Sequence, residues 1–272
     1  MELKTVRYEV APTGVATVWL DRPDRNNAWT GRMHTEYRWV LAQLESDPAV
    51  RVGVVTGSGK AFSVGGDGRA LAGHADRGGY DPGTPDELAE PGYGVHPELD
   101  HDLAFQLGLR FPLIAAVNGA CAGVAFALAC FCDLRFAAAG ARLTTAATKL
   151  GLPAEYGLSW MLPRLVGVGA AADLLYSSRI FTAADAPVGL FNAVLPDPEA
   201  LRAHVTDYAT RLATEAGPNA VSATKRLLVA DLLRHAPGTS VEDSKRLLHE
   251  HMGTAEYREG IAAFGERRPP RF

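Results

Sequence analysis

Hydrophobic positions near the start of the chain follow two different periods, and each period predicts a different kind of element. Val15–Leu20 (VATVWL) is apolar and β-branched, which predicts a strand that ends in turn residues from Asp21 onward. From Thr30 to Leu44 the apolar residues recur at helical spacing, with Thr30 as the expected N-cap. Val50–Thr56 (VRVGVVT) is typical of a buried strand, and a glycine-rich loop follows it. This order of strand, helix, strand and loop indicates an α/β fold.

The most hydrophobic segment runs from Leu113 to Cys132, twenty residues without a charge, which is the length of a membrane span. A turn dipeptide, Asn118-Gly119, interrupts its middle, and Gly123 follows. The flanks also differ, because LIAAV is strand-like whereas VAFALACFC is typical of a buried helix. We therefore expect a strand, a tight turn and a core helix, and no membrane span.

The rest of the chain contains one strand signal and several helix signals. A helix is expected around His101 to Leu109 and a strand over Asp133 to Ala138. Helical spacing then dominates the last third, in Leu201–Leu212, Asn219–Leu233 and Ser240–Phe264. We expect a core unit over residues 1–198 and a helical unit over residues 199–272.

Residues 72–98 have no hydrophobic period and are rich in glycine and proline. Long irregular segments inside compact domains are often lids over a site, but they are also tolerated as plain surface loops. Both interpretations stay open, and under the first of them His74, Asp76 and Tyr80 would reach the pocket.

The overall composition is that of a globular protein. Of 272 residues, 47% are hydrophobic and 21% charged, and a net charge of −4 gives no indication of a nucleic-acid partner. Cys121, Cys130 and Cys132 lie in apolar surroundings without zinc-ligand spacing, so we expect small core residues and a reducing, cytoplasmic compartment. The start, MELKTVRYEV, lacks the apolar region of a signal peptide.

Two glycine turns are the candidates for chemistry, since each follows an apolar strand. They are Val64-Gly65-Gly66-Asp67 and the turn from Asn118 to Val124. Turns of this kind expose backbone N–H groups at helix starts, and two that converge can hold an oxyanion. Neither matches a P-loop or a dinucleotide fingerprint, and the chain has no G-x-S-x-G or H-E-x-x-H motif. The histidines are scattered, so no metal site is predicted.

Several segments, in order and at matching spacing, resemble the crotonase (enoyl-CoA hydratase/isomerase) superfamily. They are RPDRNNAW, AFSVGGD, PLIAAVNGACAG, CDLRFA and EGIAAFGERRPPRF. The resemblance implies a spiral of ββα units with a helical C-terminal trimerisation region, assembled as a homotrimer or as a hexamer made of two trimers. It also implies an acyl-CoA thioester substrate and no metal or redox cofactor, because coenzyme A is part of the substrate.

The resemblance places the two oxyanion donors on the backbone N–H groups of Gly66 and Val124. Family members usually have glycine at the second position, and a valine keeps the N–H while it narrows the pocket. Arg25 and Arg267 match positions near the CoA phosphates, although both are equally explained as solvated surface arginines. The remaining substrate-binding candidates are Ala28, Val64, Gly65, Asp67, Gly123, Tyr156, Trp160 and Phe264. Asp67 and Asp133 are interpreted as structural, at a helix start and a turn.

The departures from the family pattern bear on the reaction. Hydratases of this family use two glutamates, and their positions here are Ala127 and Ala147. Hydration of an enoyl-CoA is therefore expected to be poor or nil. The segment LGLPAEYG instead resembles peroxisomal-type Δ3,Δ2-enoyl-CoA isomerases, whose single glutamate falls on Glu155. Apolar neighbours should raise the pKa of Glu155 toward that of a general base. The alternative is that Glu155 caps a helix or pairs with Arg164.

Three functions remain open from the sequence. The first is an enoyl-CoA isomerase with Glu155 as its single acid and base. The second is another thioester-enolate reaction, such as hydrolysis, dehalogenation or ring cleavage, on a bulky acyl group. The third is a catalytically silent acyl-CoA-binding protein.

Overall fold

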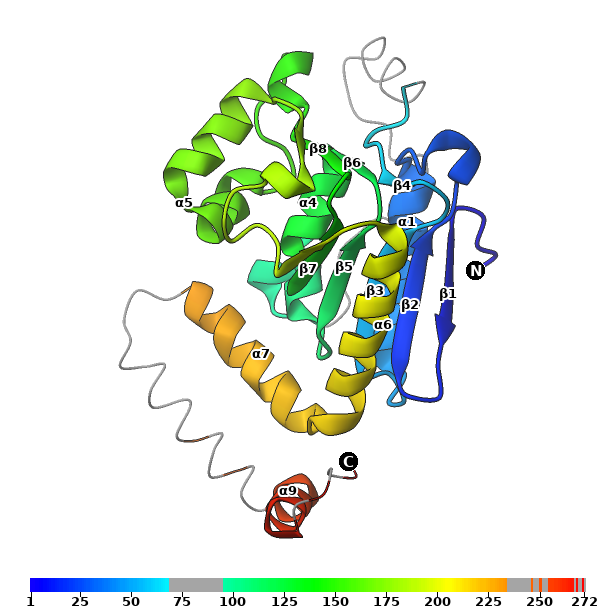
Figure 1. The fold of residues 1–272 in the computed structure, drawn as a ribbon, viewed down its shortest axis with the longest axis vertical. Helices are drawn as coiled ribbons and strands as arrows, with labels where there is room; N and C mark the ends of the chain where they lie inside the picture. Colours follow the sequence, from blue (N-terminus) through cyan, green and yellow to red (C-terminus); the bar gives the residue numbers. More distant parts are fainter. Residues whose placement is uncertain are drawn as a thin grey trace.

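The computed structural model describes residues 1–68, 95–233, 246, 250, 254–266, 268 and 271, and its centre is a six-stranded sheet. The strand order is β1-β2-β3-β5-β7-β10, and all neighbours are parallel except the antiparallel pair β1 and β2 (Figure 1). The bounds are β1 (Val6–Val10), β2 (Val15–Leu20), β3 (Val52–Gly57), β5 (Leu113–Val117), β7 (Leu134–Ala138) and β10 (Ala193–Leu195).

A second sheet of short strands follows the order β4-β6-β8-β9. These strands are β4 (Ala61–Ser63), β6 (Ala120–Ala122), β8 (Arg142–Thr144) and β9 (Phe181–Thr182). Each of β3, β5 and β7 thus leads through a tight turn into a strand of the second sheet, so a two-strand unit repeats along the chain. The α/β fold expected from the sequence is confirmed, and so is its spiral of repeated units.

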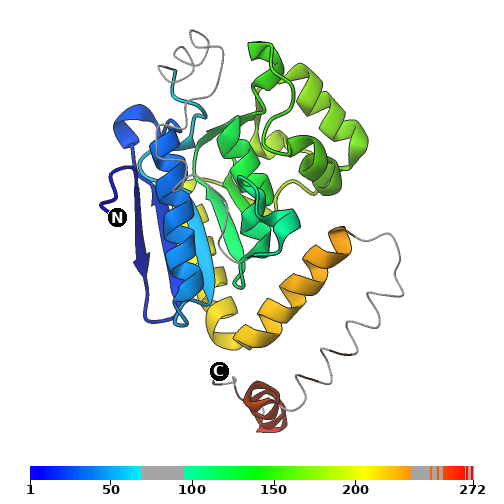
Figure 2. The same ribbon diagram turned by 180° about the vertical axis from the view of Figure 1, so that it is seen from behind.

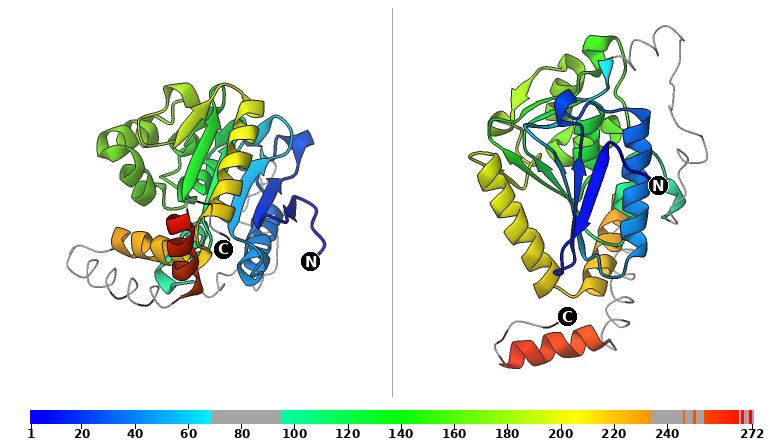
Figure 3. Two further views of the ribbon diagram at one scale, coloured as in Figure 1. Left: turned by 60° about the horizontal axis from the view of Figure 1, so that its bottom comes forward. Right: turned by 90° about the vertical axis from the view of Figure 1, so that its right-hand side faces the viewer.

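Helices cover the two faces of the large sheet. The α1 helix (Gly31–Ser46) lies on one face and α6 (Pro198–Glu215) on the other, as Figures 2 and 3 show from behind and from the side. Strand side chains alternate between the faces. Val54, Ile114 and Phe136 pack with the α6 residues Leu201, Val205 and Ala209. Val55, Leu113 and Ala115 pack instead in the main core with the α1 residues Met33, Tyr37 and Leu41.

Helix α1 begins where the sequence predicts. The Thr30 hydroxyl accepts a hydrogen bond from the Met33 amide at 3.1 Å, which is the expected N-cap. The helix expected around residues 101–109 is instead two short 3-10 segments, η2 (Pro97–Leu99) and η3 (Ala104–Gly108). A positive φ of 27° at Asp102 separates them, which an α-helix does not tolerate.

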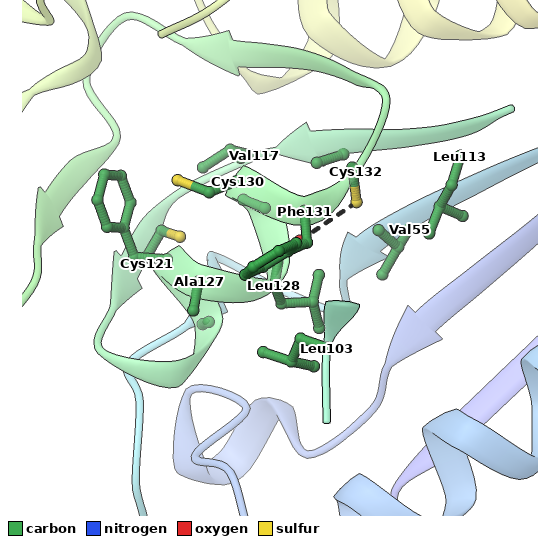
Figure 4. Packing of buried hydrophobic residues seen from close by; sticks show 14 of the residues in the cluster. Val55, Leu103, Leu113, Val117, Cys121, Ala127, Leu128, Cys130, Phe131 and Cys132 are labelled. Atoms are coloured by element: carbon green, nitrogen blue, oxygen red, sulfur yellow. Dashed lines mark hydrogen bonds between the residues drawn. The ribbon is translucent and has the colours of Figure 1, made fainter. Parts of the chain in front are cut away.

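The apolar run of residues 113–132 forms β5, β6 and the short helix α4 (Val124–Phe131), and no single span. All eight residues of α4 are buried, and Figure 4 shows Ala127, Leu128 and Phe131 among their neighbours. Cys121, Cys130 and Cys132 are buried free thiols, as expected. Burial raises the pKa of Cys130 to about 12 and that of the other two as well, so all three are protonated.

Most of the described residues after residue 150 are helical. It contains α5 (Leu158–Ser177), α6, α7 (Pro218–Leu232) and α9 (Ala255–Glu266). Glu256 of α9 accepts hydrogen bonds from Asn219 and Ala220 at the start of α7. Residues 72–94 of the segment expected to be a loop or lid lie outside the described residues, and so do His74, Asp76 and Tyr80. The division at residue 198 stays a prediction.

Among the described residues, α5 is the one helix with the length and apolar composition of a membrane span. Gly167 interrupts it with a φ of 79° and a non-helical ψ of 160°, and Pro163 lies within its first half. A single helix of this kind is weak evidence for a span.

Candidate active site

The first glycine turn is held in place by the backbone of Trp29. The Trp29 amide donates to the Gly65 carbonyl at 2.7 Å, and the Asp67 amide donates to the Trp29 carbonyl at 2.9 Å. Gly65 has a φ of +87°, and a Cβ there would lie 2.8 Å from the carbonyl oxygen of Ala122. Glycine is required at this position, since it allows the first turn to pack directly against the second.

Asp67 fixes the same turn from its other end. Both terminal nitrogens of Arg22 lie 3.2 Å from Asp67 Oδ2, and Arg22 Nη1 also donates to the Ala28 carbonyl at 2.5 Å. Arg22 and Asp67 therefore join the RPDRNNAW segment to the glycine turn. Arg22 is a functional residue that was not predicted, although it stands directly before Pro23 and its partner Asp67 directly follows two glycines.

The second turn leads into α4. Gly123 caps this helix with φ 52° and ψ −121°, and its amide donates to the Thr144 carbonyl at 3.1 Å. Val124 is the first helical residue, and its side chain is buried. Because the first amides of a helix have no partner within it, the Val124 N–H is available to a ligand, at the end that favours negative charge.

Strand pairing brings the two turns together. Strands β4 and β6 are parallel, with Ser63 opposite Cys121. Gly66 and Val124 each lie three residues beyond this pair, at the same end of neighbouring strands. Within the described part of the chain, no hydrogen bond uses the N–H of Gly66 or that of Val124. The arrangement thus presents two unused backbone donors, which is the equipment needed to stabilise an oxyanion.

Glu155 lies in the irregular segment just before α5. Burial raises the pKa of its carboxyl above the usual 4.5. Among the described residues, this carboxyl has no ion pair and no hydrogen bond, and α5 begins after Gly157 without a side-chain cap. Arg164 is occupied elsewhere, because its Nη1 donates to the Trp160 carbonyl at 2.6 Å and its guanidinium stacks 3.8 Å from the Trp160 ring centre. Neither structural alternative for Glu155 is therefore realised.

The segment that carries Glu155 packs against α4. Phe131, the last residue of α4, stacks on Trp160 with ring centres 6.5 Å apart and an interplanar angle of 1°. Gly157 has a φ of 72°, and a Cβ there would lie 3.1 Å from the Phe131 ring. Tyr156, at a φ of 51°, is partly buried against the main core. These contacts hold in place the residues that follow Glu155, from Tyr156 to the first turn of α5.

The two alanines that replace the expected hydratase glutamates are both buried. Ala127 lies inside α4, and Ala147 lies in the 3-10 segment η4 (Ala147–Leu150), where its carbonyl accepts from the Leu152 amide at 3.0 Å. Neither alanine side chain can donate or accept a proton during a reaction. Glu155 thus remains the carboxylate that the sequence analysis predicts for proton transfer.

The remaining predicted residues are spread over the surface and the turns. Arg25 is half-exposed and its Nε lies 3.7 Å from Asp24, which leaves it accessible to an anion. Ala28 is buried and Val64 is exposed. The side chain of Phe264 and all of Arg267 lie outside the described residues. Asp133 accepts from the Leu113 amide and from Lys225, each at 2.7 Å, so it anchors a turn as expected.

Comparison with known proteins places this geometry in a family. The model of the family described as "Enoyl-CoA hydratase/isomerase" matches residues 11–272. A Thermus thermophilus protein named "Putative enoyl-CoA hydratase" is 36% identical over 95% of this chain and 97% of its own length. The Escherichia coli 1,2-epoxyphenylacetyl-CoA isomerase is 32% identical over 95% of each chain. The crystal structure of enoyl-CoA hydratase from Bacillus anthracis superposes with a TM-score of 0.83 at 26% identity, over 99% of each chain.

Proposed function

This chain belongs to the enoyl-CoA hydratase/isomerase family, and we propose that it moves the double bond of an enoyl-CoA thioester, with Glu155 as its single acid and base. Two observations support the proposal. Among the described residues, the backbone N–H groups of Gly66 and Val124 make no hydrogen bond, and the Glu155 carboxyl, whose pKa is raised by burial, has no ion pair or hydrogen bond. The proposal separates this chain from hydratases, which need a second carboxylate to activate water.

The reaction would begin with a 3-enoyl-CoA whose thioester oxygen accepts hydrogen bonds from the backbone N–H groups of Gly66 and Val124. The Glu155 carboxylate removes a proton from C2, and the electron pair moves onto the thioester oxygen as a dienolate. The same carboxyl then returns the proton at C4, and the product is the conjugated 2-enoyl-CoA. No atom is gained or lost, so one carboxylate is sufficient.

The two donors and the base act on different parts of the barrier. Each oxyanion donor is worth about 10²–10³ in rate, because it binds the dienolate oxygen more strongly than the neutral carbonyl. A positioned general base contributes about 10²–10⁴. Desolvation of Glu155 favours its role, since a base whose pKa lies closer to the working pH returns a proton as readily as it removes one.

A second candidate is a thioester-enolate reaction on a bulky acyl group. It is favoured by the 32% identity to a relative named as an isomerase of 1,2-epoxyphenylacetyl-CoA, an aromatic acyl-CoA. The same two donors and the same carboxyl would serve such a substrate. A panel of straight-chain, aromatic and polycyclic thioesters decides between the two, because the preferred acyl group gives the higher kcat/KM.

Binding of coenzyme A and self-assembly complete the proposal. The accessible Arg25, together with Arg267, would hold the CoA phosphates. A homotrimer, or a hexamer of two trimers, stays a prediction of the family resemblance, and a cytoplasmic location stays a prediction from the reduced cysteines. Light scattering of the purified protein measures the assembly directly.

The test of the proposal is isomerisation of a 3-enoyl-CoA, followed by the ultraviolet absorbance of the conjugated product. We expect turnover by the unmodified protein and a loss of about 10²–10⁴ in kcat for Glu155→Gln. Glu98→Gln, at an exposed residue of η2, is a matched control that should retain full activity. An unchanged rate in Glu155→Gln would remove this residue from the mechanism.

A further inference from the structure

A short chain of buried polar groups crosses the core between α1 and α4. The Tyr37 hydroxyl, on α1, donates to Gln106 Oε1 at 2.5 Å. Gln106 Nε2, on η3, donates to the Leu128 carbonyl of α4 at 3.0 Å. Both side chains are fully buried, so each hydrogen bond replaces one that water would otherwise supply.

At its Tyr37 end, this series of hydrogen-bonded side chains supports the first glycine turn. The Tyr37 ring meets the Trp29 ring edge-on, with centres 5.8 Å apart at 68°. The Trp29 backbone in turn brackets Gly66, through its bonds to Gly65 and Asp67. A shift of Tyr37 would therefore move the first donor, through the ring contact with Trp29 and the backbone hydrogen bonds of Trp29.

At its Gln106 end, the same series of side chains holds α4, the helix that carries the second donor. Leu128 is in the last turn of α4, where carbonyl groups have no partner within the helix. Gln106 and the Cys132 thiol both donate to this carbonyl, and Figure 4 shows the thiol contact as a dashed line. Since α4 has only eight residues, fixing its last turn also fixes Val124 in its first.

We propose that Tyr37 and Gln106 are positioning residues that set the spacing between the two oxyanion donors. This inference rests on the proposed function, because it assumes that Gly66 and Val124 share one oxygen. Preorganised donors act only if their geometry is held before the charge develops, and a misplacement of about 1 Å can cost about 100-fold in rate. Neither residue needs to touch the substrate for this role.

Two variants interrupt this series of hydrogen bonds at different points. Tyr37→Phe keeps the ring against Trp29 and removes one hydroxyl, and Gln106→Met keeps the length of the side chain and removes both bonds. The control is Thr5→Val, which removes a buried hydroxyl that donates to Glu36 Oε2 at 2.7 Å. Glu36 is the neighbour of Tyr37 on α1, so this control disturbs the same helix without touching the Tyr37–Gln106 link.

The decisive readout is the stretching frequency of the thioester carbonyl in bound cinnamoyl-CoA labelled with carbon-13. Donation to the carbonyl oxygen lowers this frequency, and the size of the shift reports how well the two donors are placed. We expect a clear shift in the unmodified protein and in Thr5→Val, and a smaller one in Tyr37→Phe and Gln106→Met. With a 3-enoyl-CoA substrate that the protein isomerises, kcat should fall about tenfold or more in these two variants, while KM stays within about twofold.

The outcomes separate the two proposals. If the unmodified protein gives no shift, the oxyanion proposal fails and this inference falls with it. If the unmodified protein gives the shift and both variants give the same one, the inference alone is overturned. An equal loss in Thr5→Val would also overturn it, by showing a general loss of stability. Should Gln106→Met not accumulate as folded protein, the milder Tyr37→Phe decides the question.

Discussion

The backbone N–H of Val124 can be deleted almost in isolation, because of its place in the fold. Val124 is the first residue of α4, and its amide takes no hydrogen bond among the described residues. Proline is well accommodated at the first position of a helix, where its missing N–H has no partner to lose and its fixed φ suits the helix. Gly123, which precedes it, has no Cβ to clash with the proline ring. Val124→Pro should therefore fold and lack one oxyanion donor.

The expected magnitudes differ for catalysis and for stability. Loss of one donor should lower kcat by about 10²–10³, equivalent to about 2.7–4 kcal/mol of transition-state stabilisation. The buried side chain is replaced by one of similar volume, so the free energy of unfolding should change by less than about 2 kcal/mol. Val124→Ala is the matched control, because it keeps the N–H and loses two buried methyl groups, at about 1.6 kcal/mol.

The assay compares both variants at saturating 3-enoyl-CoA, with thermal unfolding measured on the same samples. We expect Val124→Ala to keep kcat within about threefold and Val124→Pro to lose at least about 100-fold. If the two variants have equal kcat values while both remain folded, the Val124 amide is not an oxyanion donor.

Three further predictions follow from the charges in the structure. Since the raised pKa of Glu155 must be exceeded for the carboxylate to act as a base, kcat/KM should rise with pH through an inflection above 4.5, and a profile without that limb would contradict the assignment. Lys225→Met should cost about 3 kcal/mol of unfolding free energy, because it leaves the mostly buried Asp133 without its cation; a loss below about 1 kcal/mol in urea unfolding would count against this pair. Burial lowers the pKa of His34 from 6.5 to about 4, so the unfolded state binds the proton first and stability falls as pH drops from 6.5 toward 4, by up to about 3 kcal/mol. His34→Phe should flatten that slope in denaturant titrations at pH 7 and pH 5, and an equal slope in both proteins would refute the assignment.

The elements that the sequence predicts well are those with a strong local signal. The strand over residues 15–20 has the predicted bounds, and the helix capped by Thr30 ends two residues later than expected. Both have a clear period and a recognisable end. The run from residue 113 to 132 is also divided where the turn dipeptide indicates.

The elements that the sequence missed depend on contacts between distant residues. Strands of two or three residues, such as β4, β6 and β9, are too short for a period and exist because of the strands beside them. Helix α5 was not predicted, since Pro163 and Gly167 are strong helix-breaking signals. The structure accommodates both, with a kink at Gly167.

The candidate site shows the same division. Each glycine turn could be recognised from its own residues, but only the register of β4 against β6 brings Gly66 and Val124 to the same end of adjacent strands. Glu155 was found through the family resemblance, and the structure adds the absence of a partner for its carboxyl among the described residues. Tyr37 was predicted only as a residue on the apolar face of its helix, and Gln106 was not predicted at all. Their hydrogen bonds had no signal in the sequence, because buried polar residues are recognised only by what surrounds them.

The most direct test of the account is a crystal structure with an unreactive acyl-CoA, such as a saturated thioester, bound to the protein. The account predicts a thioester oxygen about 2.7–3.1 Å from the amide nitrogens of both Gly66 and Val124. It also predicts a Glu155 carboxylate oxygen about 3–3.5 Å from C2 of the acyl chain. A thioester oxygen bound elsewhere, or a Glu155 carboxyl turned into solvent away from C2, would contradict it.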